Sequence, residues 1–168
     1  FEKKKVFCIL LIFFSVISCS SSEDKKLTDL SKKNKIELPA LWKFAIDDFN
    51  NFLPEEAFEK FKLVEKDYFY TDWAPRSLLM IAYVYYEANR CADAISAVER
   101  YIKFYPNNIE RIYAEYLKGV CYFEEVSEFS KDQDNTFKAI NQFKLLISSY
   151  PNTEYANDAK YKLDLLND

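Results

Sequence analysis

Residues 78–106 have the sequence LLMIAYVYYEANRCADAISAVERYIKFYP and contain two amphipathic segments. Their small and apolar side chains recur three or four positions apart, at Leu78, Ile81, Ala82, Tyr85, Ala94, Val98 and Tyr101. This period predicts two helices, each with one apolar face. The small residues Ala82 and Ala94 allow the two helices to approach closely, and Pro106 stops the second helix. The stretch therefore predicts an antiparallel helix hairpin.

The hairpin pattern is repeated on both sides of this stretch. Tyr68-Phe69, Tyr105-Pro106 and Tyr150-Pro151 each close an amphipathic segment, with spacings of 37 and 45 residues. The copies resemble the tetratricopeptide repeat, and Gly119 takes the small position in the third copy. This resemblance implies an all-α fold, a tetratricopeptide-like α-solenoid of antiparallel helix hairpins. We predict helices near residues 39–51, 54–67, 72–88, 91–104, 109–127, 135–148 and 153–166.

The third repeat is longer than the others. Polar residues 130–135 are inserted between its two helices, where we predict a longer loop. Residues 38–168 would then form three tetratricopeptide-like repeats and the first helix of a fourth. Since a stacked repeat needs a neighbour or a cap to cover its apolar face, we expect the chain to be the N-terminal portion of a longer protein.

The first residues have the pattern of a targeting segment. Three lysines precede the apolar run Val6–Ile17, which is too short to span a bilayer, so residues 1–18 are predicted to be a signal peptide. Val16-Ile17-Ser18-Cys19 resembles the bacterial lipoprotein box, which implies lipidation of Cys19. Polar residues 19–37 would then be the lipidated cysteine and a flexible tether. The alternative is an ordinary signal peptide with a chance cysteine.

The composition restricts the chemistry that this chain can perform. There is one glycine and no histidine, which excludes glycine-rich phosphate loops, Ser-His or Cys-His dyads and His-ligated metals. A net charge of −4 without a basic stripe argues against nucleic-acid binding. We predict that the protein is not an enzyme, binds no metal and carries no cofactor except the lipid on Cys19. Cys91 and Cys121 lie in helical patterns, which favours buried free thiols over a disulfide.

These features together resemble the BamD family of outer-membrane lipoproteins. The stretches that carry the resemblance are Tyr70–Ala74, Leu79–Tyr86, Tyr101–Asn107, Tyr116–Gly119, Asp132-Gln133 and Tyr150–Ala159. The resemblance implies a non-catalytic scaffold of the β-barrel assembly machinery, lipid-anchored on the periplasmic face of the outer membrane. Its implied partners are the barrel subunit, other assembly lipoproteins and unfolded outer-membrane proteins. The alternatives are another periplasmic tetratricopeptide adaptor, in cell division or peptidoglycan machinery, or the N-terminal part of a lipoprotein enzyme.

The first helices of stacked hairpins line a concave groove in tetratricopeptide folds. The repeat alignment therefore predicts a peptide-binding groove lined by Trp42, Ile46, Phe49, Arg76, Leu79, Tyr83, Tyr86, Tyr116, Val120 and Phe123. Aromatic side chains offer a large contact area at a low entropy cost, and Arg76 offers a donor for a carboxylate or a carbonyl. The alternative for each aromatic residue is simple packing between hairpins.

Overall fold

A computed structural model describes residues 37–126 and 133–167 of the chain, with the side chain of Asn167 left out. The described helices are α2 (Leu38–Asn50), α3 (Pro54–Asp67), α4 (Trp73–Glu87), α5 (Cys91–Phe104), α6 (Arg111–Glu124), α7 (Gln133–Ser149) and α8 (Glu154–Asn167). They agree with the predicted helices to within three residues at every end. The predicted signal peptide, the lipidation site Cys19, nearly all of the tether and residues 130–132 of the insertion lie outside the described residues.

Local sequence signals explain where the helices begin and end. Pro54 occupies the first turn of α3, where its missing N–H costs nothing, and Glu55 and Glu56 complement the helix dipole there. Helix α4 ends at Glu87, and Asn89 then adopts a left-handed conformation with φ 57°, which asparagine tolerates. The chain turns at this point and enters α5.

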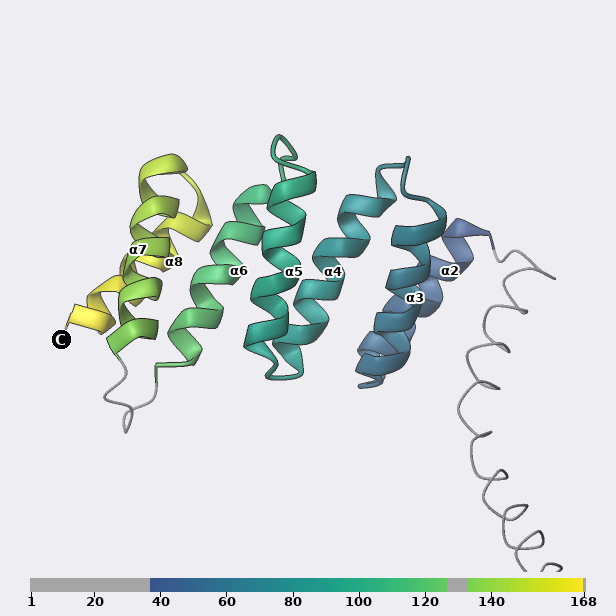
Figure 1. Cartoon of the computed structure of the whole chain (residues 1–168), viewed down its shortest axis with the longest axis horizontal. Coiled ribbons are helices and arrows are strands. Elements are labelled where there is room, and N and C mark those ends of the chain that lie inside the picture. Colours follow the sequence, from purple (N-terminus) through teal and green to yellow (C-terminus); the bar gives the residue numbers. More distant parts are fainter. Residues whose placement is uncertain (1–36, 127–132, 168) are drawn as a thin grey trace, which may run out of the picture. The chain divides into compact units, whose positions relative to one another are not determined.

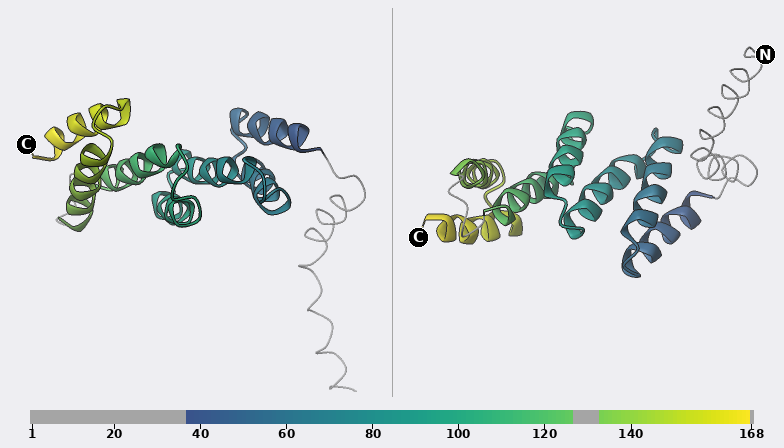
Figure 2. Two further views of the ribbon diagram at one scale, coloured as in Figure 1. Left: turned by 90° about the horizontal axis from the view of Figure 1, so that it is seen from above. Right: turned by 60° about the horizontal axis from the view of Figure 1, so that its bottom comes forward.

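Consecutive helices pack against each other along the whole described unit, and Figure 1 shows α2 to α6 in sequence order, with α7 and α8 together at the other end. The pairs α2–α3, α4–α5 and α6–α7 are the three hairpins, and α8 packs on both α6 and α7. In Figure 2, α3, α5 and α7 lie on one side of the row of first helices α2, α4, α6 and α8. The predicted all-α fold of stacked antiparallel hairpins is therefore confirmed. None of the described helices is long and apolar enough to cross a membrane.

Small residues allow the hairpins to close, as the pattern predicts. Ala45, Ala82 and Ala94 have no exposed surface and lie in one core that joins the first two hairpins to α6. A second core, around Phe143, joins α6, α7 and α8. Cys91 and Cys121 are buried and unbridged. The seam of small residues therefore sets how closely the first helices stack and which of their side chains reach the surface.

Candidate functional site

The first helices of the hairpins enclose a hollow of about 530 Å³. Its lining comes from α2, α4, the turn before α6, α6 itself and α8, namely Trp42, Arg76, Leu79, Met80, Tyr83, Glu110, Tyr113 and Tyr155. A neighbouring hollow of about 430 Å³ shares Tyr83 and also contacts Phe49, Phe52 and Glu87. Because Tyr83 belongs to both hollows, they adjoin along the row of first helices. We call the first of them the main groove.

Aromatic rings connect the helices of the main groove. Phe49 contacts Tyr83 at 5.5 Å between ring centroids, and Tyr83 contacts Tyr113 at 6.4 Å. Tyr155 lies 5.7 Å from Tyr113 and 5.2 Å from Tyr116. We call these five residues, Phe49, Tyr83, Tyr113, Tyr116 and Tyr155, the aromatic strip. It runs across α2, α4, α6 and α8, so a ligand lying along it would contact every first helix.

The charged groups that line the main groove are one cation and one carboxylate. Arg76 has 53% of its side chain exposed, and its Nε lies 3.8 Å from Oε1 of Glu110. Such an exposed and long ion pair contributes little stability, so the guanidinium keeps donors for a ligand. Oε2 of Glu110 is buried and has no hydrogen-bond partner within the described part of the chain. An unsatisfied buried acceptor is costly, so this oxygen destabilises the turn before α6.

The structure brings part of the predicted set together. Trp42, Arg76, Leu79 and Tyr83 line the main groove, Phe49 lies in the adjoining hollow and Tyr116 lies on the aromatic strip. Tyr86 faces a smaller hollow shared with Glu124 and Cys91.

The remaining three predicted groove residues pack against the cores. Ile46 is half-buried against the first core and Val120 is only 5% exposed. Phe123 is half-buried beside Phe143, with the Lys162 ammonium over its ring. Their assignment to a binding surface stays a prediction.

The sequence-based set omitted Met80, Glu110, Tyr113 and Tyr155, which all line the main groove. One signal could have found Tyr113, because it lies 37 residues after Arg76, the same offset that separates Gly119 from Ala82. Tyr155 reaches the groove only because α8 packs back on α6. No local pattern indicates that contact.

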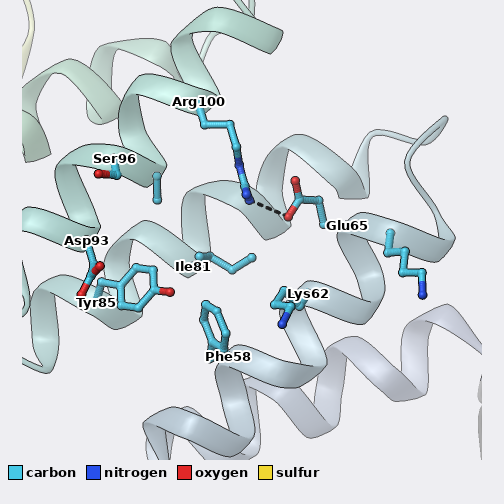
Figure 3. Close-up of a pocket in the computed structure, with 10 residues that line it drawn as sticks. Phe58, Lys62, Glu65, Ile81, Tyr85, Asp93, Ser96 and Arg100 are labelled. Carbon is cyan, nitrogen blue, oxygen red and sulfur yellow. Dashed lines mark hydrogen bonds and ion pairs between the residues drawn. The ribbon is translucent and has the colours of Figure 1, made fainter. Parts of the chain in front are cut away.

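Another hollow of about 530 Å³ lies on the face of the repeats opposite the main groove, between α3 and α5. We call it the α3–α5 hollow. Figure 3 shows Phe58, Ile81 and Tyr85 at its apolar floor, with charged residues around them. Arg100 donates to Glu65 at 2.8 Å. The Lys62 ammonium lies 5.2 Å from the centre of the Phe58 ring. The main groove is the better candidate for binding, because the aromatic strip continues it across α2, α4, α6 and α8, whereas this hollow reaches only α3, α4 and α5.

Burial changes the ionisation of the aromatic strip. It raises the pKa of Tyr113 and Tyr116 well above the ordinary tyrosine value near 10, and the hydrogen bond that Tyr116 donates to Asp158 at 2.6 Å raises that of Tyr116 further. The stability from these neutral side chains is fully present below pH 10, where unfolded tyrosine is also neutral. It is lost progressively as the pH rises from about 10 toward the folded pKa values, because over this range the unfolded chain ionises and the folded chain does not.

We therefore expect the free energy of unfolding to fall above about pH 10. Urea titrations at a series of pH values between 8 and 11 would measure this decline, followed by circular dichroism. The double variant Tyr113→Phe/Tyr116→Phe should show a shallower decline, because phenylalanine cannot ionise. Equal slopes for the variant and the parent chain would contradict the assignment to these two hydroxyls.

Comparison with known proteins relates the helical part of the chain to one family. Residues 37–168 match the family model of YfiO, described as an outer membrane lipoprotein. The chain is 37% identical over 159 residues to the outer membrane protein assembly factor BamD of Caulobacter vibrioides, which covers 95% of this chain and 51% of that relative. It is 36% identical over 97 residues to the protein of the same name from Rickettsia prowazekii, which covers 58% and 39%. The chain thus spans about half the length of the curated relatives it matches.

Proposed function

Because the chain belongs to the YfiO family of outer membrane lipoproteins, we propose that it is a non-catalytic scaffold that takes part in assembling outer-membrane proteins. In this proposal the main groove binds an extended segment of an unfolded outer-membrane protein. The chain also contacts a barrel subunit and other assembly lipoproteins, and it needs no cofactor. The observation that carries the proposal is the aromatic strip, which crosses four first helices beside an exposed arginine.

The chemistry of the main groove suits an extended, partly aromatic peptide. Rings on the peptide would stack against Tyr83 and Tyr113, where aromatic pairs contribute about 0.5–1.5 kcal/mol each beyond buried area. Arg76 would donate to a terminal carboxylate or to a backbone carbonyl.

The membrane part of the proposal concerns the N-terminal residues. Cleavage before Cys19 and acylation of that cysteine would anchor the chain to the periplasmic face of the outer membrane. Several acyl chains on one residue give stable attachment, since each buried CH₂ contributes about 0.8 kcal/mol. Residues 20–37 would then separate the helical repeats from the membrane surface. Mass spectrometry of the mature protein tests this part, because an unacylated Cys19 would refute it.

The groove is tested by replacing Tyr83 and Tyr155, which both line it, together with alanine. We expect the Kd for a labelled peptide ending in phenylalanine, with a free carboxylate, to rise at least about tenfold, because the aromatic contact area is lost. Fluorescence polarisation with the full chain carrying Cys19→Ser measures the affinity, and circular dichroism checks the helices. An unchanged Kd in a folded double variant would rule out the groove.

Two controls sharpen this experiment. Tyr85 lies on the same helix as Tyr83 but on the opposite face, where it lines the α3–α5 hollow. Tyr85→Ala should therefore leave the Kd for the peptide unchanged. Amidating the peptide carboxylate should weaken binding to the parent chain but not to an Arg76→Gln variant, if Arg76 holds the carboxylate. Equal loss in both chains would show that Arg76 contacts another part of the peptide.

A further inference from the structure

Two cysteines from different hairpins meet beneath the groove surface. Cys91 is the first residue of α5, in the second hairpin, and Cys121 lies near the end of α6, in the third. Cys91 lines a small hollow together with Glu124, which lies three residues after Cys121 on α6. Both side chains belong to the same core, and α5 packs directly on α6. The two cysteines are therefore neighbours in the fold, although 29 residues separate them in the sequence.

The two thiols differ in their access to solvent. Cys91 is 8% exposed and lines a small hollow with Tyr86, Glu87, Asn89 and Glu124. Cys121 has no exposed surface. A reagent that enters the hollow therefore meets Cys91, whereas Cys121 offers it no surface.

From this arrangement we propose that Cys91 and Cys121 are a dithiol oxidation site, at which a disulfide oxidant links the second hairpin to the third. The Cys91 thiolate attacks one sulfur of the oxidant RS–SR, which forms a mixed disulfide and releases one thiolate. The Cys121 thiolate then attacks Sγ of Cys91, forms the internal disulfide and releases the second thiolate. Two electrons pass to the oxidant, and the two protons from the cysteines end on two RSH molecules.

Ionisation sets the order of the two steps. Burial raises the pKa of both thiols, and the nearby carboxylates of Glu124 and Glu125 raise them further. The influence of each thiol on the other acts in opposite directions, because it lowers the pKa of Cys91 and raises that of Cys121. Cys91 is therefore the attacking thiol and Cys121 the resolving thiol. The reaction is slow at neutral pH, because little thiolate is present.

The disulfide would link the second hairpin to the third, and the main groove is lined by residues of both hairpins. Tyr83 belongs to the second hairpin, whereas Tyr113 and Tyr116 belong to the third. A crosslink that closes a loop of about 30 residues restricts the unfolded chain, so we expect Tm to rise by about 5 °C or more on oxidation.

The test uses the full chain with Cys8→Ser and Cys19→Ser, so that only the proposed pair can react. The chain is incubated with oxidised glutathione at mildly alkaline pH, and then alkylated and analysed by intact-mass and peptide mass spectrometry. We expect both thiols to disappear together, with a peptide linking Cys91 to Cys121 and no retained glutathione. Two retained glutathiones, or two thiols that stay free in the native chain but react after denaturation, would overturn the proposal.

Single cysteine variants distinguish two thiols that react in sequence from two cysteines that react independently. In Cys121→Ala the mixed disulfide should accumulate at Cys91, because no resolving thiol is present. In Cys91→Ala the buried Cys121 should react with glutathione at least about tenfold more slowly, because its thiol is reached only when the fold opens locally. Equal glutathione uptake by the two variants would refute the assigned roles, and circular dichroism confirms that both are folded.

Discussion

The substitution Phe61→Ala should lower the free energy of unfolding by about 3–5 kcal/mol. Phe61 has no exposed surface, and its ring packs edge-on against Trp42 with 5.2 Å between centroids. Alanine would remove the ring from the core that joins α2, α3 and α4, and the surrounding backbone cannot collapse to fill the space. Urea titration of the full chain, followed by circular dichroism, measures the change.

A matched control distinguishes cavity formation from the simple loss of an aromatic ring. Phe69 is 54% exposed in the turn after α3, so Phe69→Ala should change the free energy of unfolding by less than about 0.5 kcal/mol. Because each hairpin contacts only its neighbours, hydrogen exchange in Phe61→Ala should increase in α2, α3 and α4 more than in α7 and α8. A loss below about 1 kcal/mol, or uniform exchange, would contradict this account of the core.

The helices could be predicted from sequence because their signals are local. Apolar residues three and four positions apart mark α4 and α5, and Pro54 marks the start of α3. The stacking of hairpins followed from the repeat offset, since Ala82 and Gly119 take equivalent positions 37 residues apart. These features depend on period and residue size, which one sequence records directly.

The groove could be predicted only in part, because its composition depends on how far each helix turns toward its neighbours. Val120 falls on the predicted face but is covered by packing, whereas Glu110 lies in a turn that the alignment did not assign to any face. Tyr155 enters the groove through the contact of α8 with α6, and the Cys91–Cys121 pair depends on the register of α5 against α6. Such registers are tertiary properties, and periodicity does not determine them.

Gly119→Ala should destabilise the chain by about 2–3 kcal/mol, although alanine is the better helix former. Gly119 lies within α6, where a Cβ would stand 2.6 Å from Cε1 and 2.8 Å from Cδ1 of Phe143. That ring has no exposed surface. The neighbouring Gln142 is held by bonds from its Nε2 to Glu115 Oε2 at 2.8 Å and to the Glu115 carbonyl at 3.1 Å. With α7 held in this way, the ring has little room to withdraw.

A double-mutant cycle with Phe143→Leu isolates this contact. The shorter leucine leaves room for the new methyl group, so Gly119→Ala in that background should cost nothing or stabilise α6 by up to about 1 kcal/mol. The sign of the Gly119→Ala effect should thus depend on residue 143, which urea titrations of the four chains would measure. If alanine stabilises the parent chain as well, α6 and α7 are not in the close contact described. In that case a small residue at this position would not be what allows the third hairpin to close.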